Sequence, residues 1–126
     1  FARVAFNIVI GNTDDHARNH AAGWEVGRLL QTPASDLDPT RSPAWDANQG
    51  MAYSASGERR SNLATLLAAA PEFGVSRSQG RALMEDMVTT VRQDWTEARN
   101  AAGLTATQAD GLLGAVVLNP GALDGF

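Results

Sequence analysis

Three polar residues have types and a spacing that suit phosphoryl transfer. Asp14 and Asn19 are five positions apart, and Asp36 follows seventeen positions after Asn19. This reaction needs a carboxylate that accepts or orients the hydroxyl proton of the substrate. It also needs a carboxamide and a second carboxylate to hold the magnesium ions that bridge the nucleotide phosphates, and Asn19 and Asp36 could supply those oxygens. Taken alone, Asp14 could equally be an ordinary turn or N-cap aspartate.

The elements before and after these residues must bring them together. Residues 1–10 are mainly apolar, and their polar exceptions, Arg3 and Asn7, are four positions apart, which favours a helix. Gly11 and Asn12 tolerate left-handed conformations and are expected to end it. A catalytic loop is therefore predicted to begin where this helix stops.

The polar residues 11–20 form that loop, and a small β-hairpin is predicted over residues 20–31 around Val26-Gly27. The hairpin reverses the chain, so Asp36 is expected to face the same ions as Asn19. Residues 32–40, which contain Asp36, are called the metal loop. Trp24 and Trp95 are expected to be core or hairpin packing residues.

The rest of the chain is predicted to be irregular first and helical afterwards. Residues 41–60 contain proline and glycine and are expected to be an irregular segment. The helical region covers residues 61–118, and its first helix is expected to be capped by Ser61 and closed by Pro71.

Two further helices are predicted within that region. Ser76 or Ser78 should begin the longer one, and Gly103 stands where a C-terminal glycine belongs. Thr105 should cap the last helix, which is expected to run through Val117 and stop at Pro120. The predicted fold class is therefore mainly α, with one small hairpin beside the catalytic loop.

Composition excludes several kinds of chemistry. The chain has 126 residues, about the size of one domain, with a net charge of −4, so a broad electrostatic contact with nucleic acid is not expected. All ten basic residues are arginine, which rules out a Walker-type lysine or a Schiff base within this chain. Cysteine is absent, and no apolar run is long enough to span a membrane. We expect a cytoplasmic protein without membrane contact.

The segments Asn7 to His20 (NIVIGNTDDHARNH) and Leu30 to Leu37 (LQTPASDL) resemble the catalytic core of the HipA family of bacterial serine/threonine kinases, the toxins of toxin–antitoxin pairs. The resemblance is closest over residues 7–38. It implies that Asp14 is the catalytic aspartate and that Asn19 and Asp36 are metal ligands.

The resemblance further implies Mg²⁺ and ATP as cofactors, a protein substrate such as an aminoacyl-tRNA synthetase or another translation factor, and a HipB-like DNA-binding antitoxin. This chain departs from the family in two ways. Ser35 stands where family members usually have an aromatic residue, and the glycine-rich loop and lysine of the N-terminal lobe are not found. The resemblance therefore implies a C-terminal catalytic-lobe fragment, inactive alone because the groups that orient and neutralise the nucleotide are missing.

The neighbours of the candidate site residues have less specific roles. His16 is expected to support the catalytic loop by hydrogen bonding to its backbone, and Arg18 could meet a phosphate, although a surface ion pair is its more usual role. Asp15 is expected to be a solvated loop carboxylate.

Two alternative functions remain open from the sequence. His16 and His20 have the four-residue spacing of zinc ligands on a helix, which would suit a metal-dependent hydrolase, but Ala17 stands where zinc peptidases have glutamate. A non-catalytic helical interaction domain would instead expose an apolar patch around Phe1, Val4 and Ile8.

Overall fold

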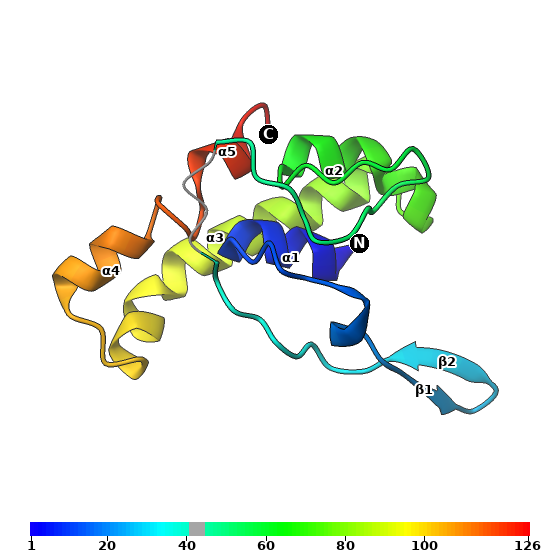
Figure 1. Ribbon diagram of the computed structural model, residues 1–126, viewed down its shortest axis with the longest axis horizontal. Helices are drawn as coiled ribbons and strands as arrows, with labels where there is room; N and C mark the ends of the chain where they lie inside the picture. Colours follow the sequence, from blue (N-terminus) through cyan, green and yellow to red (C-terminus); the bar gives the residue numbers. More distant parts are fainter. Residues whose placement is uncertain (41–44) are drawn as a thin grey trace.

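The computed structural model describes residues 1–40 and 45–126 and confirms the predicted mainly α class (Figure 1). The elements are, in chain order, α1 (Ala2–Ile10), a 3₁₀ helix (Ala17–Asn19), β1 (Ala22–Glu25), β2 (Arg28–Gln31), α2 (Leu63–Ala69), a second 3₁₀ helix (Ala70–Phe73), α3 (Arg77–Ala101), α4 (Ala106–Leu112) and α5 (Pro120–Leu123).

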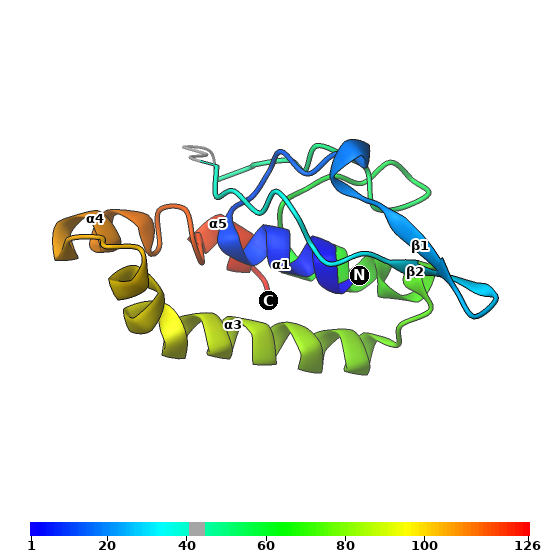
Figure 2. The same cartoon turned by 90° about the horizontal axis from the view of Figure 1, so that it is seen from below.

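The core lies where α1 packs against α2 and α3. Figure 2 shows α1 lying along the long α3. The apolar face of α1 contributes Ile8 and Val9, which are fully buried with Leu66 of α2 and Met84 of α3. Because α1 is packed in this way, the loop that leaves its C-terminal end starts from a fixed point.

The end of α1 agrees with the sequence prediction. Gly11 has φ 74° and donates its backbone N–H to carbonyls of the last turn, and Asn12 N–H donates to Asn7 O at 2.8 Å. A β-carbon on Gly11 would lie 2.6 Å from the carbonyl oxygen of Val116. Glycine is therefore required here both for the left-handed turn and for the close approach of the C-terminal segment.

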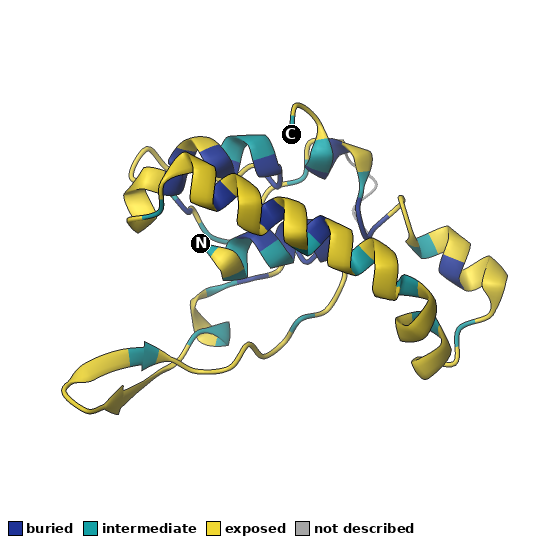
Figure 3. Cartoon of the chain, turned by 180° about the vertical axis from the view of Figure 1, so that it is seen from behind, coloured by how far each residue is buried: buried dark blue, intermediate teal, exposed yellow. Residues whose placement is uncertain are grey.

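The predicted hairpin is present, and it projects away from the helices (Figures 1 and 3). Val26 and Gly27 both have positive φ, 47° and 80°, as the two-residue turn of a twisted hairpin requires. Trp24 pairs with Leu29 across the strands, and both side chains are largely exposed. Of the two roles expected for Trp24, the core role is wrong, whereas its place opposite Leu29 agrees with a residue of the hairpin.

The long helix α3 begins as predicted, and the shorter α2 differs in detail. Ser76 forms a capping box with Gln79 at the start of α3. The cap of α2 is Asn62 and not Ser61, because the Asn62 side chain accepts the Thr65 N–H at 2.9 Å. The α-helix ends at Ala69, two residues before Pro71, and Pro71 lies within the 3₁₀ helix that follows α2.

The predicted last helix is wrong in extent. Thr105 caps α4 as expected, but α4 ends at Leu112 and the chain then turns. Leu118 has a left-handed φ of 54° and donates its N–H to Val9 O at 2.8 Å, a contact with α1 that a continuous helix would not allow. Pro120 begins α5, because proline suits the first turn of a helix, where no N–H is needed.

The irregular segment predicted at residues 41–60 is described from residue 45 onward; its first four residues lie outside the described part. Residues 45–60 contain no helix and one isolated bridge, between Asn48 and Arg60. Within the described ranges, every helix is too short or too polar to cross a lipid bilayer.

Candidate functional site

The candidate site is an open pocket of about 380 Å³ between the catalytic loop and the metal loop. Each residue that lines it carries a side-chain oxygen: Asn12, Thr13, Asp14, Asp36, Asp38 and Thr40. Asp14 and Asp36, far apart in sequence, both line it with exposed side chains. An oxygen-lined, acidic pocket suits a hard cation and its phosphate ligands.

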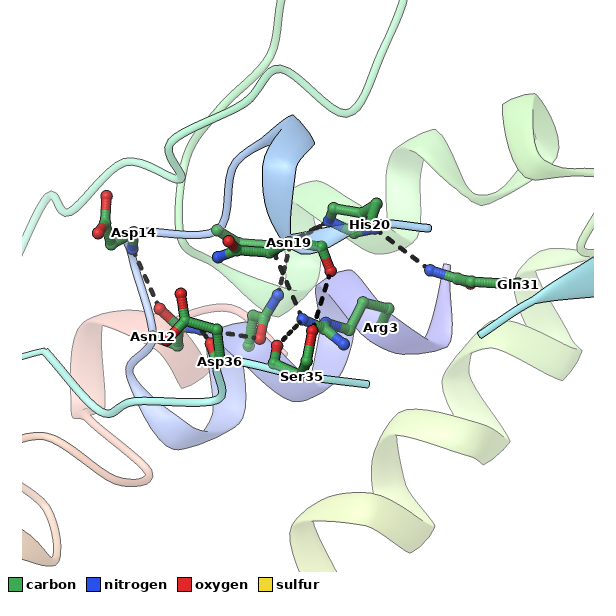
Figure 4. A network of polar contacts seen from close by, with 10 residues as sticks. Arg3, Asn12, Asp14, Asn19, His20, Gln31, Ser35 and Asp36 are labelled. Carbon is green, nitrogen blue, oxygen red and sulfur yellow. Dashed lines mark hydrogen bonds and ion pairs between the residues drawn. The ribbon is translucent and has the colours of Figure 1, made fainter. Parts of the chain in front are cut away.

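Asn12 connects the two aspartates. Its side chain is 1% exposed; it accepts the backbone N–H of Asp14 at 3.1 Å and donates to the carbonyl of Asp36 at 3.2 Å (Figure 4). It also donates to Asn7 Oδ1 on α1 at 3.3 Å. Asp36 has a left-handed φ of 56°, a conformation that aspartate tolerates better than most residues. A single buried carboxamide thus holds both loops against α1.

The third predicted residue, Asn19, lies further along the loop. It is half-buried at the end of the 3₁₀ helix and is not among the residues that line the pocket, although Figure 4 places it beside His20. Its backbone carbonyl is 3.5 Å from Ser35 Oγ, directly before Asp36. Arg18, within the same 3₁₀ helix, is exposed.

Asp15 corrects a sequence prediction, because it is buried and not solvated. Its exposed fraction is 3%, and its carboxylate accepts from Asn7 Nδ2 at 2.6 Å and from His20 Nε2 at 2.9 Å. Arg3 Nη2 lies 3.7 Å away. The sequence signal was the polar pair Arg3 and Asn7 on an otherwise apolar helix, since buried polar groups need partners.

The two histidines have different environments. His16 Nδ1 is buried without a hydrogen-bond partner, so this ring nitrogen does not make the backbone contact expected of His16. His20 uses both ring nitrogens, Nε2 towards Asp15 and Nδ1 towards Gln31 Nε2 at 3.2 Å. The two residues also flank a 3₁₀ turn and do not share an α-helical face, so the spacing argument for zinc does not apply.

Gly50 packs against the backbone of the catalytic loop, and its role was not predicted from the sequence. A β-carbon there would lie 2.5 Å from the carbonyl oxygen of Asp15. Only glycine allows the two backbones to approach this closely. Nothing in the local pattern around Gly50 distinguishes it from a turn glycine, because its partner is 35 positions away.

The apolar patch expected of an interaction domain is not found at the first segment. Ile8 is fully buried, Phe1 and Val4 are half-buried, and Phe1 packs edge-on against Phe73 with ring centroids 5.7 Å apart. Large exposed apolar side chains lie on the hairpin instead, at Trp24, Val26 and Leu29.

The oxygen donors of the pocket suit magnesium. Within the described residues, no three His, Cys, Asp or Glu side chains are gathered closely enough to hold an ion by themselves. Magnesium in phosphoryl-transfer sites usually takes one or two carboxylates and completes its octahedron with water and phosphate. The exposed carboxylate of Asp36 in an oxygen-lined pocket fits that arrangement.

Together, fold and site define a mainly helical chain in which an acidic pocket lies beside a small hairpin. A family model described as HipA-like C-terminal domain matches residues 1–95, which include the pocket, the hairpin and most of α3. The chain therefore belongs to the HipA-like C-terminal domain family, which confirms the resemblance seen in the sequence. The comparisons with curated proteins and with solved structures found no match.

Proposed function

We propose that this chain is the catalytic-loop part of a HipA-like serine/threonine protein kinase, the toxin component of a toxin–antitoxin pair. One observation carries the proposal: Asp14 and Asp36, twenty-two positions apart, line one oxygen-rich pocket, and Asn12 bonds the backbone of both. Membership of the HipA-like family supports it.

In this proposal each residue has a defined task. Asp14 accepts the proton of a serine or threonine hydroxyl of the substrate. The oxygen of that hydroxyl bonds to the γ-phosphorus, and the bond between this phosphorus and the leaving ADP oxygen breaks. Asp36 would hold Mg²⁺ from the pocket lining, and Asn19, which lies outside that lining, is the proposed second ligand; the ion would offset the negative charge of the phosphates. Arg18 and His16 belong to the loop that carries Asp14 and Asn19 and would support it.

The nucleotide needs cationic groups that this pocket does not supply. The chain has no lysine, and the residues that line the pocket include no arginine. We place the phosphate-binding lysine and the glycine-rich loop in a separate N-terminal lobe of the intact kinase. The 126 residues alone should then transfer phosphate at a negligible rate, because charge stabilisation and orientation supply most of the acceleration.

The proposed partners are a protein substrate, such as an aminoacyl-tRNA synthetase or another translation factor, and a HipB-like antitoxin. A second candidate function, a non-catalytic interaction domain, is favoured by the exposed Trp24–Leu29 pair on the hairpin. Measured phosphoryl transfer separates the two, since an interaction domain requires none.

The test uses the intact gene product that contains this chain, with ATP, Mg²⁺ and candidate substrate proteins. Asp14→Asn should lower the rate of phosphoryl transfer about 10²- to 10⁴-fold, the usual contribution of a general base. Asp110→Asn makes the same chemical change on the exposed surface of α4 and should leave the rate unchanged. Near wild-type transfer by Asp14→Asn would show that the base is assigned wrongly, and an inactive wild type would remove the kinase proposal.

A further inference from the structure

Asp14 and Asp15 are neighbours in the chain but face different surroundings. Asp14 is exposed at the pocket, whereas Asp15 is 3% exposed beneath it. A buried carboxylate is costly unless it is paired and hydrogen-bonded, and Asp15 has partners on two sides. Asn7 donates from α1 at 2.6 Å, and His20 donates from the start of the hairpin at 2.9 Å. Asp15 therefore ties three segments of the chain together at one carboxylate.

The pairing of Asp15 with His20 is not arranged as a catalytic dyad. Gln31 Nε2 donates to His20 Nδ1 at 3.2 Å, so the imidazole proton lies on Nε2 and is donated to Asp15. A histidine that acts as a base needs a ring nitrogen free for its substrate. Here both nitrogens are engaged, and the contact links the loop to β2.

Two chains of polar contacts, one of them through an ion pair, connect Asp15 to the metal loop. In the first, Arg3 Nη2 lies 3.7 Å from the Asp15 carboxylate and donates to the carbonyl of Ser35, directly before Asp36, at 2.6 Å. Arg3 is thus the cation that joins the buried aspartate to the residue preceding the proposed metal ligand.

The second chain runs through two asparagines. Asn7, which is bonded to Asp15, accepts from Asn12 at 3.3 Å. Asn12 in turn bonds the backbones of Asp14 and Asp36 (Figure 4). Both proposed active residues are therefore held by backbone contacts that lead back to one buried carboxylate.

We propose that Asp15 is a positioning residue that fixes the distance between Asp14 and Asp36 through Asn12 and Arg3. This inference rests on the proposed phosphoryl-transfer function, since only then does that distance limit a rate. Misplacing reacting groups by about 1 Å can cost about 10²-fold in rate. Asp15 is not among the residues that line the pocket, so it acts only through these contacts.

The first arm of the test measures kinetics in the intact protein. Asp15→Asn keeps the side-chain shape but places an amide donor against the donors of Asn7 and His20. We expect kcat to fall about 10²-fold with little change in KM for ATP, because the loss affects the arrangement of the reacting groups and not nucleotide binding.

A double variant provides the rescue. Asn7→Asp combined with Asp15→Asn exchanges carboxylate and amide across the same hydrogen bond and keeps acceptors for Asn12 and His20. The pair should recover at least about tenfold of the lost kcat, as coupled residues do in a double-mutant cycle. Asp110→Asn again serves as the surface control.

The second arm is independent of activity. Amide hydrogen exchange in the same protein should show that Asp15→Asn speeds exchange at the Asp14 N–H while Met84 and Val88 of α3 keep their protection. Unchanged kcat and unchanged exchange at Asp14 would overturn the proposal. Loss of protection in α3 together with kcat would also overturn it, because Asp15 would then act on overall stability. If the wild type transfers no phosphate, the kinase proposal fails, and the exchange at Asp14 still tests the coupling.

Discussion

Buried side-chain amides connect parts of this chain that are far apart in sequence, and Asn62 does this most completely. It is 3% exposed; its Oδ1 accepts from the N–H and the hydroxyl of Thr65 at the start of α2. Its Nδ2 donates to the carbonyls of Gly121 and Asp124 at 3.0 and 2.9 Å. The cap of α2 is therefore also the attachment point of the C-terminal segment.

We predict that Asn62→Ala lowers the free energy of unfolding by about 2–4 kcal/mol, because a helix cap is lost and a buried carbonyl is left without its donor. Denaturant unfolding of the 126-residue chain measures this. Ser76→Ala removes an exposed cap from α3 and should cost only about 1 kcal/mol. Equal losses for the two variants would show that the contacts of Asn62 with the C-terminal segment contribute nothing.

The sequence predicted the two aspartates of the pocket but not the buried aspartate beside them. The spacing of Asp14 and Asp36 indicated that they serve one site, and both line one pocket. The neighbouring Asp15 was assigned to solvent, because a loop sequence does not tell which of two adjacent carboxylates faces the protein. Arg3 and Asn7 indicated that a carboxylate of the loop is buried, since two polar residues on one face of an apolar helix require a buried partner.

At the scale of elements, the hairpin contains a local conflict. Val26 occupies a turn position with φ 47°, and β-branched residues are strained in the left-handed region. Its side chain is fully exposed, so no packing offsets this cost. Asparagine is the preferred residue at this position before glycine in such turns.

We predict that Val26→Asn stabilises the hairpin by about 1 kcal/mol, the cost of a left-handed non-glycine residue. Amide exchange over residues 22–31 should slow by about fivefold, the factor that corresponds to 1 kcal/mol. Global unfolding should change little, because the hairpin lies outside the core. Val26→Thr keeps the β-branch and should leave exchange as it is; equal slowing in both variants would contradict the backbone explanation.

The helices were predictable where local signals decide their ends, and not where distant contacts do. Ser76 with Gln79 at the start of α3 and Gly11 at the end of α1 are local caps, and both agree with the structure. The region after α4 differs, because Leu118 donates its N–H to the carbonyl of Val9, which lies near the other end of the sequence. A contact of this kind leaves no periodic signal in the sequence near Leu118.

For the whole molecule, the absence of lysine leaves few groups that titrate at alkaline pH. The chain has no lysine, no cysteine and one tyrosine, so Tyr53 is the one side chain whose ordinary pKa lies between about 9 and 11.

Tyr53 is 8% exposed and its side chain belongs to the core, and its hydroxyl donates to the carbonyl of Arg60 at 2.8 Å within the irregular segment. Burial, followed by the negative charge of Glu58, raises the pKa of Tyr53 above its ordinary value of 10.0, although Arg60 opposes the shift. The native state therefore keeps a proton that the unfolded chain releases. The stabilisation from this group is complete below pH 10 and is lost as the pH rises towards the native pKa.

We predict that the free energy of unfolding falls by up to about 1.4 kcal/mol for each pH unit above pH 10. Denaturant unfolding at a series of alkaline pH values measures the slope, and phenolate absorbance reports the titration of Tyr53 in the same samples. Tyr53→Phe should be less stable near neutral pH by about 1 kcal/mol, because the Arg60 carbonyl loses its donor. Its stability should then be nearly independent of pH in this range, so an equal alkaline slope in Tyr53→Phe would place the titrating group elsewhere in the chain.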